Sequence, residues 1–183
     1  VEMRRQLTLI GAMMVRLGDA DGMVCGTVGS YSDHLRYIDE VIGRRTGSNC
    51  YAAMNILLLD ERMVALVDTH VNHEPNAEQI AEYTLAAAQV LKRMDVTPKA
   101  ALLSRSSFGS GDSGSGLKMQ QALQLVRERA PDLEIDGEMH GDAALDEQIR
   151  QEILPTSTLT GSANLLVCPN VDAGNIAYNL LKT

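Results

Sequence analysis

Aromatic residues are scarce in this sequence: tryptophan is absent, phenylalanine occurs once, and the aromatic share is 3%. The core must therefore be built from aliphatic side chains, with nine methionines available to fill irregular gaps. No apolar run approaches the roughly 20 residues that cross a bilayer, and no signal peptide is recognisable. With 183 residues and 45% hydrophobic content, the chain is long enough to bury a sizeable core in one domain.

Positive charge and paired cysteines are also scarce. The chain has 16 Lys and Arg against 24 Asp and Glu, a net charge of -8, and no basic run, so neither nucleic acid nor an anionic membrane is an expected partner. Cys25, Cys50 and Cys168 lack CxxC spacing, which predicts reduced thiols in a cytoplasmic protein. His70 and His73 are the closest pair of histidines, but their spacing is not that of a known metal motif, and no metal site is predicted.

The most informative stretch runs from residue 99 to residue 130. Residues 99–104 predict a buried strand, residues 105–116 form a loop rich in Gly and Ser, and residues 117–130 predict an amphipathic helix. Such a connection points backbone N–H groups and the positive end of a helix at one spot, which suits phosphate or another anion. A flexible surface connection is the alternative interpretation. The candidate hydrogen-bond donors and cations are Ser104, Arg105, Ser106, Gly109, Ser110 and Lys118.

Strands and helices are expected to alternate along the chain. The predicted strands are residues 23–28, 51–59, 63–68, 99–104, 131–136 and 163–168, the second and third of them forming a hairpin. Three helices are predicted at residues 34–42, 117–130 and 142–153. Three more are predicted from their ends: the first helix ends at Gly18, another begins after the cap Asn76 with Gln79 as its partner, and the last begins within residues 169–174. Most of these strands are uniformly apolar, which predicts an α/β sandwich with a mostly parallel sheet.

Ligands of such sheets bind beyond the carboxyl ends of the strands. Four loops with unusual chemistry, residues 29–33, 104–116, 136–142 and 169–175, are therefore expected to converge at that edge. Glu138, Asn170, Asp172 and Asn175 are the candidate binding residues of the last two loops. Asp136 and Asp142 are interpreted as structural, as a strand end and a helix cap.

Several blocks, in order along the chain, resemble the phosphate acetyltransferase/butyryltransferase family. They are Gly-Asp-Ala-Asp-Gly-Met-Val at residues 18–24, Ala-Glu-Gln-Ile-Ala-Glu at 77–82, Ala-Leu-Leu-Ser at 101–104, Asp-Gly-Glu-Met-His-Gly-Asp-Ala-Ala at 136–144 and Pro-Asn-Val-Asp-Ala-Gly-Asn at 169–175. The longer run at 129–142, with residues 11–15 and 37–40, is similar to the transferase-like C-terminal domain of hybrid bacterial NADP-dependent malic enzymes.

The resemblance implies a three-layer α/β/α sandwich of the phosphotransacetylase type, which is like isocitrate and isopropylmalate dehydrogenases. It implies that residues 1–183 are mainly the second of two lobes, with some of the segment between the lobes before it, truncated at both ends of a longer chain. The expected ligands are acetyl-CoA, CoA or phosphate, and the expected role is regulation of the malic enzyme domain. NADP and a divalent metal would then belong to the N-terminal part of the parent protein. A homodimer through this lobe is also implied.

Two departures from the family argue against acetyl transfer by this chain alone. The family's catalytic Ser-Arg pair and its partner Asp lie in a segment beyond residue 183, so no catalytic residue is assigned here. True acetyltransferases usually have a Ser- and Gly-rich loop that contains Thr or Lys after the central strand. Here that loop contains Asp112, and a carboxylate would repel phosphate.

Three alternatives stay open. The chain could be a genuine phosphate acetyltransferase, which moves acetyl between CoA and phosphate, or a plain oligomerisation module. A dinucleotide site is the third, because residues 109–114 match GxGxxG and Glu134 follows some twenty residues later. In the dinucleotide fingerprint, however, the first glycine turns directly off the strand, and here it does not.

Overall fold

The computed structural model describes residues 6–60, 62–110 and 114–183. The chain divides into two compact units, Val1–Asn49 and Cys50–Thr183, which are called unit 1 and unit 2 below. Asp112, together with the middle of the glycine-rich motif, lies outside the described residues.

The described part of unit 1, residues 6–49, contains two helices, α1 (Leu7–Leu17) and α2 (Tyr31–Val41). As predicted, α1 ends at Gly18, whose φ of 80° is a left-handed cap that glycine adopts without strain. Helix α2 begins three residues earlier than predicted, because the Ser30 hydroxyl accepts the Asp33 N–H and caps it.

The buried strand predicted at residues 23–28 is wrong. These residues form an irregular connection, and both Val24 and Val28 are exposed. A strand needs a neighbour for its backbone N–H and C=O groups, and the described part of unit 1 contains no other strand to pair with. An apolar sequence alone was therefore insufficient to make a strand here.

Unit 2 is built on one five-stranded sheet with the order β1-β2-β5-β3-β4. The strands are β1 (Met54–Leu58), β2 (Met63–Val67), β3 (Lys99–Leu103), β4 (Glu134–Met139) and β5 (Leu165–Val167). Strands β1 and β2 form the predicted antiparallel hairpin, with Met54 opposite Val67. All other neighbours are parallel, which confirms the mostly parallel sheet.

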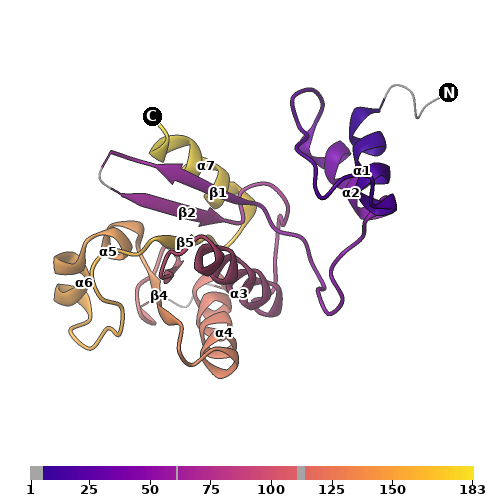
Figure 1. Ribbon diagram of the computed structural model, residues 1–183. Coiled ribbons are helices and arrows are strands. Elements are labelled where there is room, and N and C mark those ends of the chain that lie inside the picture. The colour runs from indigo at the N-terminus through magenta and orange to yellow at the C-terminus, as the bar shows by residue number, and fades with distance from the viewer. Residues whose placement is uncertain (1–5, 61, 111–113) are drawn as a thin grey trace. The chain divides into compact units, whose positions relative to one another are not determined.

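Helices cover both faces of this sheet. They are α3 (Ala77–Arg93), α4 (Gly114–Arg129), α5 (Gly141–Leu145), α6 (Glu147–Ile153) and α7 (Val171–Leu181). Successive residues of β5 alternate between two cores: Leu165 packs with α3 and α4, and Leu166 packs with α5 and α7. Figure 1 shows α3 and α4 together on one side of the sheet and α7 on the other. The predicted three-layer α/β/α sandwich is confirmed.

Helix α3 begins as its sequence predicts. The Asn76 side chain accepts the Gln79 N–H, and the Gln79 side chain accepts the Asn76 N–H, forming a reciprocal capping box. Its buried residues, including Ile80, Ala87 and Leu91, form one face against the sheet.

Two boundaries around β4 differ from the prediction. The predicted loop at 137–141 is wrong in its first half, because β4 continues through Gly137 to Met139. Asp142 is not the helix cap: His140 holds that position, and Asp142 lies in the first turn of α5, where it accepts the N–H of Ala143. The single helix predicted to reach Ile153 is also wrong. It breaks at Asp146, whose carboxylate accepts two N–H groups and caps α6.

Within the described ranges, no helix combines the length and the apolar character needed to cross a membrane.

Candidate functional site

The carboxyl ends of β2, β3, β4 and β5 lie at the same edge of the sheet, because these strands run parallel. Hydrogen bonds join the loops there. The Ser106 hydroxyl donates to Glu138 Oε1 at 3.1 Å, which links the loop after β3 to the end of β4. Lys118 Nζ donates to the Pro169 carbonyl at 2.9 Å, which links α4 to the loop after β5. The loop after β3 therefore meets the end of β4, whereas the loop after β5 is joined to helix α4. The fourth predicted loop, residues 29–33, belongs to unit 1.

Glu138, near the end of the outermost strand β4, binds the loop that follows β3. It is fully buried, and its Oε1 accepts both the Ser106 hydroxyl and the Gly109 N–H, the latter at 2.9 Å. Its backbone carbonyl accepts the Phe108 N–H at 2.7 Å. Its other oxygen, Oε2, is buried and has no hydrogen-bond partner among the described residues. Glu138 therefore holds the Ser- and Gly-rich loop through both its side chain and its backbone.

The rest of this loop also bonds to itself and to β4. Ser104 and Ser106 have their hydroxyl oxygens 3.3 Å apart, and the Ser110 hydroxyl accepts the Ser107 N–H at 3.0 Å. The exposed Arg105 offers its carbonyl to His140 Nε2 at 2.8 Å. Two donors that the sequence assigned to an anion, the Ser106 hydroxyl and the Gly109 amide, are thus directed to Glu138.

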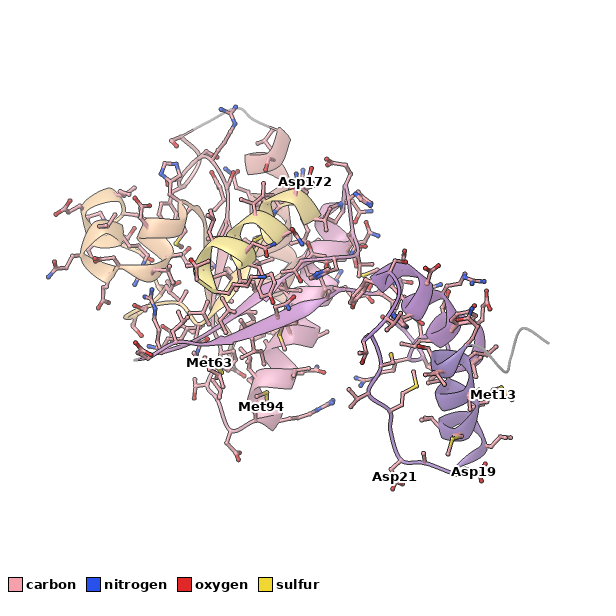
Figure 2. The ribbon with its side chains drawn as sticks, turned by 90° about the horizontal axis from the view of Figure 1, so that it is seen from above. Met13, Asp19, Asp21, Met63, Met94 and Asp172 are labelled. Carbon is pink, nitrogen blue, oxygen red and sulfur yellow. The ribbon has the colours of Figure 1, made fainter. Side chains whose placement is uncertain are left out.

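Lys118 and the start of α7 line the same edge. Lys118 lies 3.8 Å from Glu74 in addition to its bond to Pro169, so its charge is partly neutralised. Asn170 caps α7 by accepting the Ala173 N–H, and Asn175 donates to the Thr69 carbonyl at 3.2 Å. Asp172 is exposed in the first turn of α7, and Figure 2 shows it far from Met63 and Met94, which mark the opposite end of unit 2.

Asp136 has a structural role, but not as a strand end. It lies in the middle of β4 and is buried. Arg127 contacts one of its oxygens at 3.0 Å, while the Ser157 hydroxyl and the Thr158 N–H donate to the other. These bonds fix the segment before β5 and leave Asp136 no role at the carboxyl edge.

Asp68, directly after β2, was missed by sequence reasoning. Its buried carboxylate accepts N–H groups from Ala53, His70, Val71 and Asn72, so it organises the start of the following loop. The only signal in the sequence was an acidic residue at the end of an apolar strand.

Two buried groups lie near Asp68. Burial raises the pKa of the Cys168 thiol to about 12, and the negative charge of Asp68 adds to this. Burial, and secondarily Asp68, also raises the pKa of Tyr83. Both side chains therefore stay protonated in the folded state, and neither is a candidate nucleophile.

Unit 1 contains a cavity of about 630 Å³ lined by residues that include Gly29, Asp33, His34 and Arg36. The Thr8 hydroxyl lies 2.6 Å from His34 Nδ1, and His34 Nε2 has no partner among the described residues. The Ser30 hydroxyl donates to Asp33 and lowers the pKa of that carboxyl.

Arg36 lies one turn into α2 and is another residue that sequence reasoning missed. Its guanidinium lies 4.5 Å from the centre of the Tyr37 ring and 3.5 Å from Glu40, and the side chain is largely exposed. The signal was available, because Arg36 follows the small-residue loop at 29–33 by one helical turn. No group of three or more His, Cys, Asp or Glu side chains suited to a metal occurs within the described ranges.

Comparisons with known proteins agree on the family to which this chain is similar. The family described as phosphate acetyl/butaryl transferase matches residues 1–183. The NADP-dependent malic enzyme of Escherichia coli is 55% identical over 175 residues, which are 96% of this chain and 23% of that protein. The NAD-dependent malic enzyme of Rhizobium meliloti is 51% identical over 180 residues, 98% of this chain and again 23% of that protein.

A solved structure agrees with the sequence comparison. A phosphotransacetylase from Streptococcus pyogenes superposes with a TM-score of 0.91 at 31% identity, covering 99% of this chain and 56% of that one. The chain therefore spans about a quarter of the length of these malic enzymes and over half of a phosphotransacetylase.

Proposed function

This chain belongs to the phosphate acetyl/butaryl transferase family, and we propose that it serves as an acyl-CoA-binding regulatory domain of a malic enzyme. The observation that carries the proposal is the identity of 55% and 51% to two malic enzymes over nearly the whole chain, against 31% to the phosphotransacetylase. The oxidative decarboxylation of malate to pyruvate and CO2, with NADP and a divalent metal, would then take place in a part of the protein outside these residues.

The described residues offer contacts for such a ligand in each unit taken by itself. In unit 1, the exposed Arg36 beside the cavity supplies a cation for a phosphate group of CoA. In unit 2, the loop around Ser104 and Ser106 supplies hydrogen-bonding groups at the carboxyl edge. Acyl-CoA would regulate the parent enzyme by binding one of its conformational states more tightly than another.

The test uses the full-length protein. Acetyl-CoA at a hundred times its dissociation constant should stabilise the folded state by about 2.7 kcal/mol, visible as a rise in melting temperature. Malate oxidation should change over the same concentration range. Arg36→Gln should require more acetyl-CoA for both effects, while Arg93→Gln at the end of α3 serves as the matched control. If acetyl-CoA changes neither the melting temperature nor the rate of malate oxidation, the proposal is wrong.

A second candidate, a phosphate acetyltransferase, is favoured by the TM-score of 0.91 over 99% of this chain. In that reaction the acetyl group leaves the CoA sulfur and joins a phosphate oxygen, which releases the CoA thiol. Formation of acetyl phosphate from acetyl-CoA and phosphate by the full-length protein would favour it. So would a Ser-Arg pair with a nearby Asp in the protein sequence after Thr183.

The remaining assignments are proposals of the same kind. We propose that the parent protein is cytoplasmic and forms a homodimer through this domain. Sedimentation of the full-length protein tests the dimer, and a monomer at micromolar concentration would reject it.

A further inference from the structure

The hydrogen bonds between Ser104, Ser106 and Glu138 have a definite direction. A serine hydroxyl has one proton to donate, and that of Ser106 goes to Glu138 Oε1 at 3.1 Å. Because that proton is already used, a hydrogen bond across the 3.3 Å contact between the two serine hydroxyls has Ser104 as its donor and Ser106 as its acceptor. The protons of this chain of groups, named here the serine relay, all point inward to the carboxylate.

The serine relay is consequently rich in acceptors and poor in donors. Ser104 Oγ accepts the Ser106 N–H at a long 3.4 Å and retains a further lone pair, and the residue is only half-buried. The Gly109 N–H is also directed to Glu138 Oε1. Glu138 Oε2 is buried and has no donor within the described ranges. A group that reaches Ser104 from outside meets an oxygen that needs a hydrogen-bond donor.

We propose that the serine relay recognises an amide N–H of the pantetheine arm of acyl-CoA, and not a phosphate group. The inference rests on the proposed acyl-CoA function and names which part of the ligand this loop contacts. An ionised phosphate presents only acceptors, so it cannot donate a hydrogen bond to Ser104 Oγ. A pantetheine amide N–H is neutral and supplies the missing proton. This arrangement of hydrogen-bond acceptors argues against the phosphate-binding role that the sequence of the Gly- and Ser-rich loop suggests.

The test uses calorimetry to measure the affinity of the full-length protein for two ligands. One is acetyl-CoA, and the other is 3′-phosphoadenosine 5′-diphosphate, which carries the phosphates of CoA but no pantetheine arm. Ser104→Ala removes the acceptor, so the affinity for acetyl-CoA should fall about three- to tenfold, the worth of one hydrogen bond. The affinity for the diphosphate should stay unchanged. Ser162→Ala, at the opposite edge of the sheet, is the control.

One further variant tests the direction of the relay. Ser106→Ala removes the acceptor for the Ser104 proton, which then turns outward, so acetyl-CoA should again bind more weakly. Melting temperatures of all variants show whether each one folds.

The outcomes separate this inference from the function it rests on. If the wild-type protein binds acetyl-CoA but Ser104→Ala binds it equally well, the relay has no part in recognition and the inference is wrong. Equal weakening of both ligands would also overturn it, because the effect would not come from the pantetheine arm. Failure of the wild-type protein to bind acetyl-CoA at all would reject the proposed function itself, and this inference with it.

Discussion

Gly174 marks the closest approach between α7 and the sheet. A Cβ atom at this position would lie 2.0 Å from the backbone oxygen of Asp68, and neither backbone can move without disturbing the core. We expect Gly174→Ala to destabilise the protein by about 3 kcal/mol or more, at the upper end of overpacking effects. Urea unfolding measures this. Gly141→Ala, where no atom lies within 4 Å of the added Cβ, should change the stability by less than about 1 kcal/mol.

Cys168 makes stability depend on alkaline pH. Burial raises its thiol pKa to about 12 in the folded state, whereas the unfolded thiol keeps the ordinary pKa of 9.0. The unfolded state therefore loses its proton first, and stability falls as the pH rises through the window between these values, by at most about 1.4 kcal/mol per pH unit. Cys168→Ala should make this fall shallower in urea unfolding at several pH values. An unchanged slope would contradict the assignment.

Side-chain contacts differ in how far the sequence could predict them. Asn76 was predicted correctly because its partner Gln79 lies three positions away. Glu138 was only a candidate, since its partner Ser106 is 32 positions distant and no local pattern reveals that contact. The direction of the hydrogen bonds in the serine relay could not be predicted from the sequence. The sequence contains the two serines and the glutamate, but only the atomic positions show which group donates to which.

At the scale of elements, the capping box of α3 gives a direct test. Asn76→Ala removes the acceptor of the Gln79 N–H and should cost about 1 kcal/mol of stability. Gln89→Ala, at an exposed position within the same helix, is the matched control and should have little effect or stabilise slightly. The midpoints of urea unfolding of the two variants are compared. Equal midpoints would show that the cap makes no measurable contribution to stability.

Helices and strands were predicted correctly where the local sequence pattern determines them. They were predicted poorly where packing against another segment of the chain determines them. The hairpin of β1 and β2 and the helix α3 follow from apolar runs, a tight turn and a cap. Gly137 was mistaken for a loop signal, but it lies within β4, where a Cβ would be 2.7 Å from the Leu102 oxygen of β3. Glycine there permits close packing of two strands, which the sequence does not distinguish from a turn.

At the scale of the whole molecule, the family resemblance predicted the sandwich and a segment before it, but it gave no boundary; the chain divides after residue 49. Both hydrophobic cores are built from residues of unit 2. In unit 1, the buried residues within the described range are Thr8, Ala12 and Tyr37, whereas Leu7 and Leu17 are largely exposed. The helical spacing of Leu7, Ile10, Met14 and Leu17 predicts α1, but it does not predict that both leucines stay largely exposed in the described part of unit 1.

This distribution predicts that the two units differ in their ability to fold alone. A chain of about 40 residues or fewer rarely buries enough surface without disulfides or metals, and unit 1 is close to that limit. We expect residues 50–183 to unfold in one cooperative transition in urea, with a midpoint near that of the whole chain. Residues 1–49 should show no cooperative transition. A sharp transition in the short fragment, or a non-cooperative one in residues 50–183, would mean that the stability of the chain depends on contacts outside the two cores of the sheet.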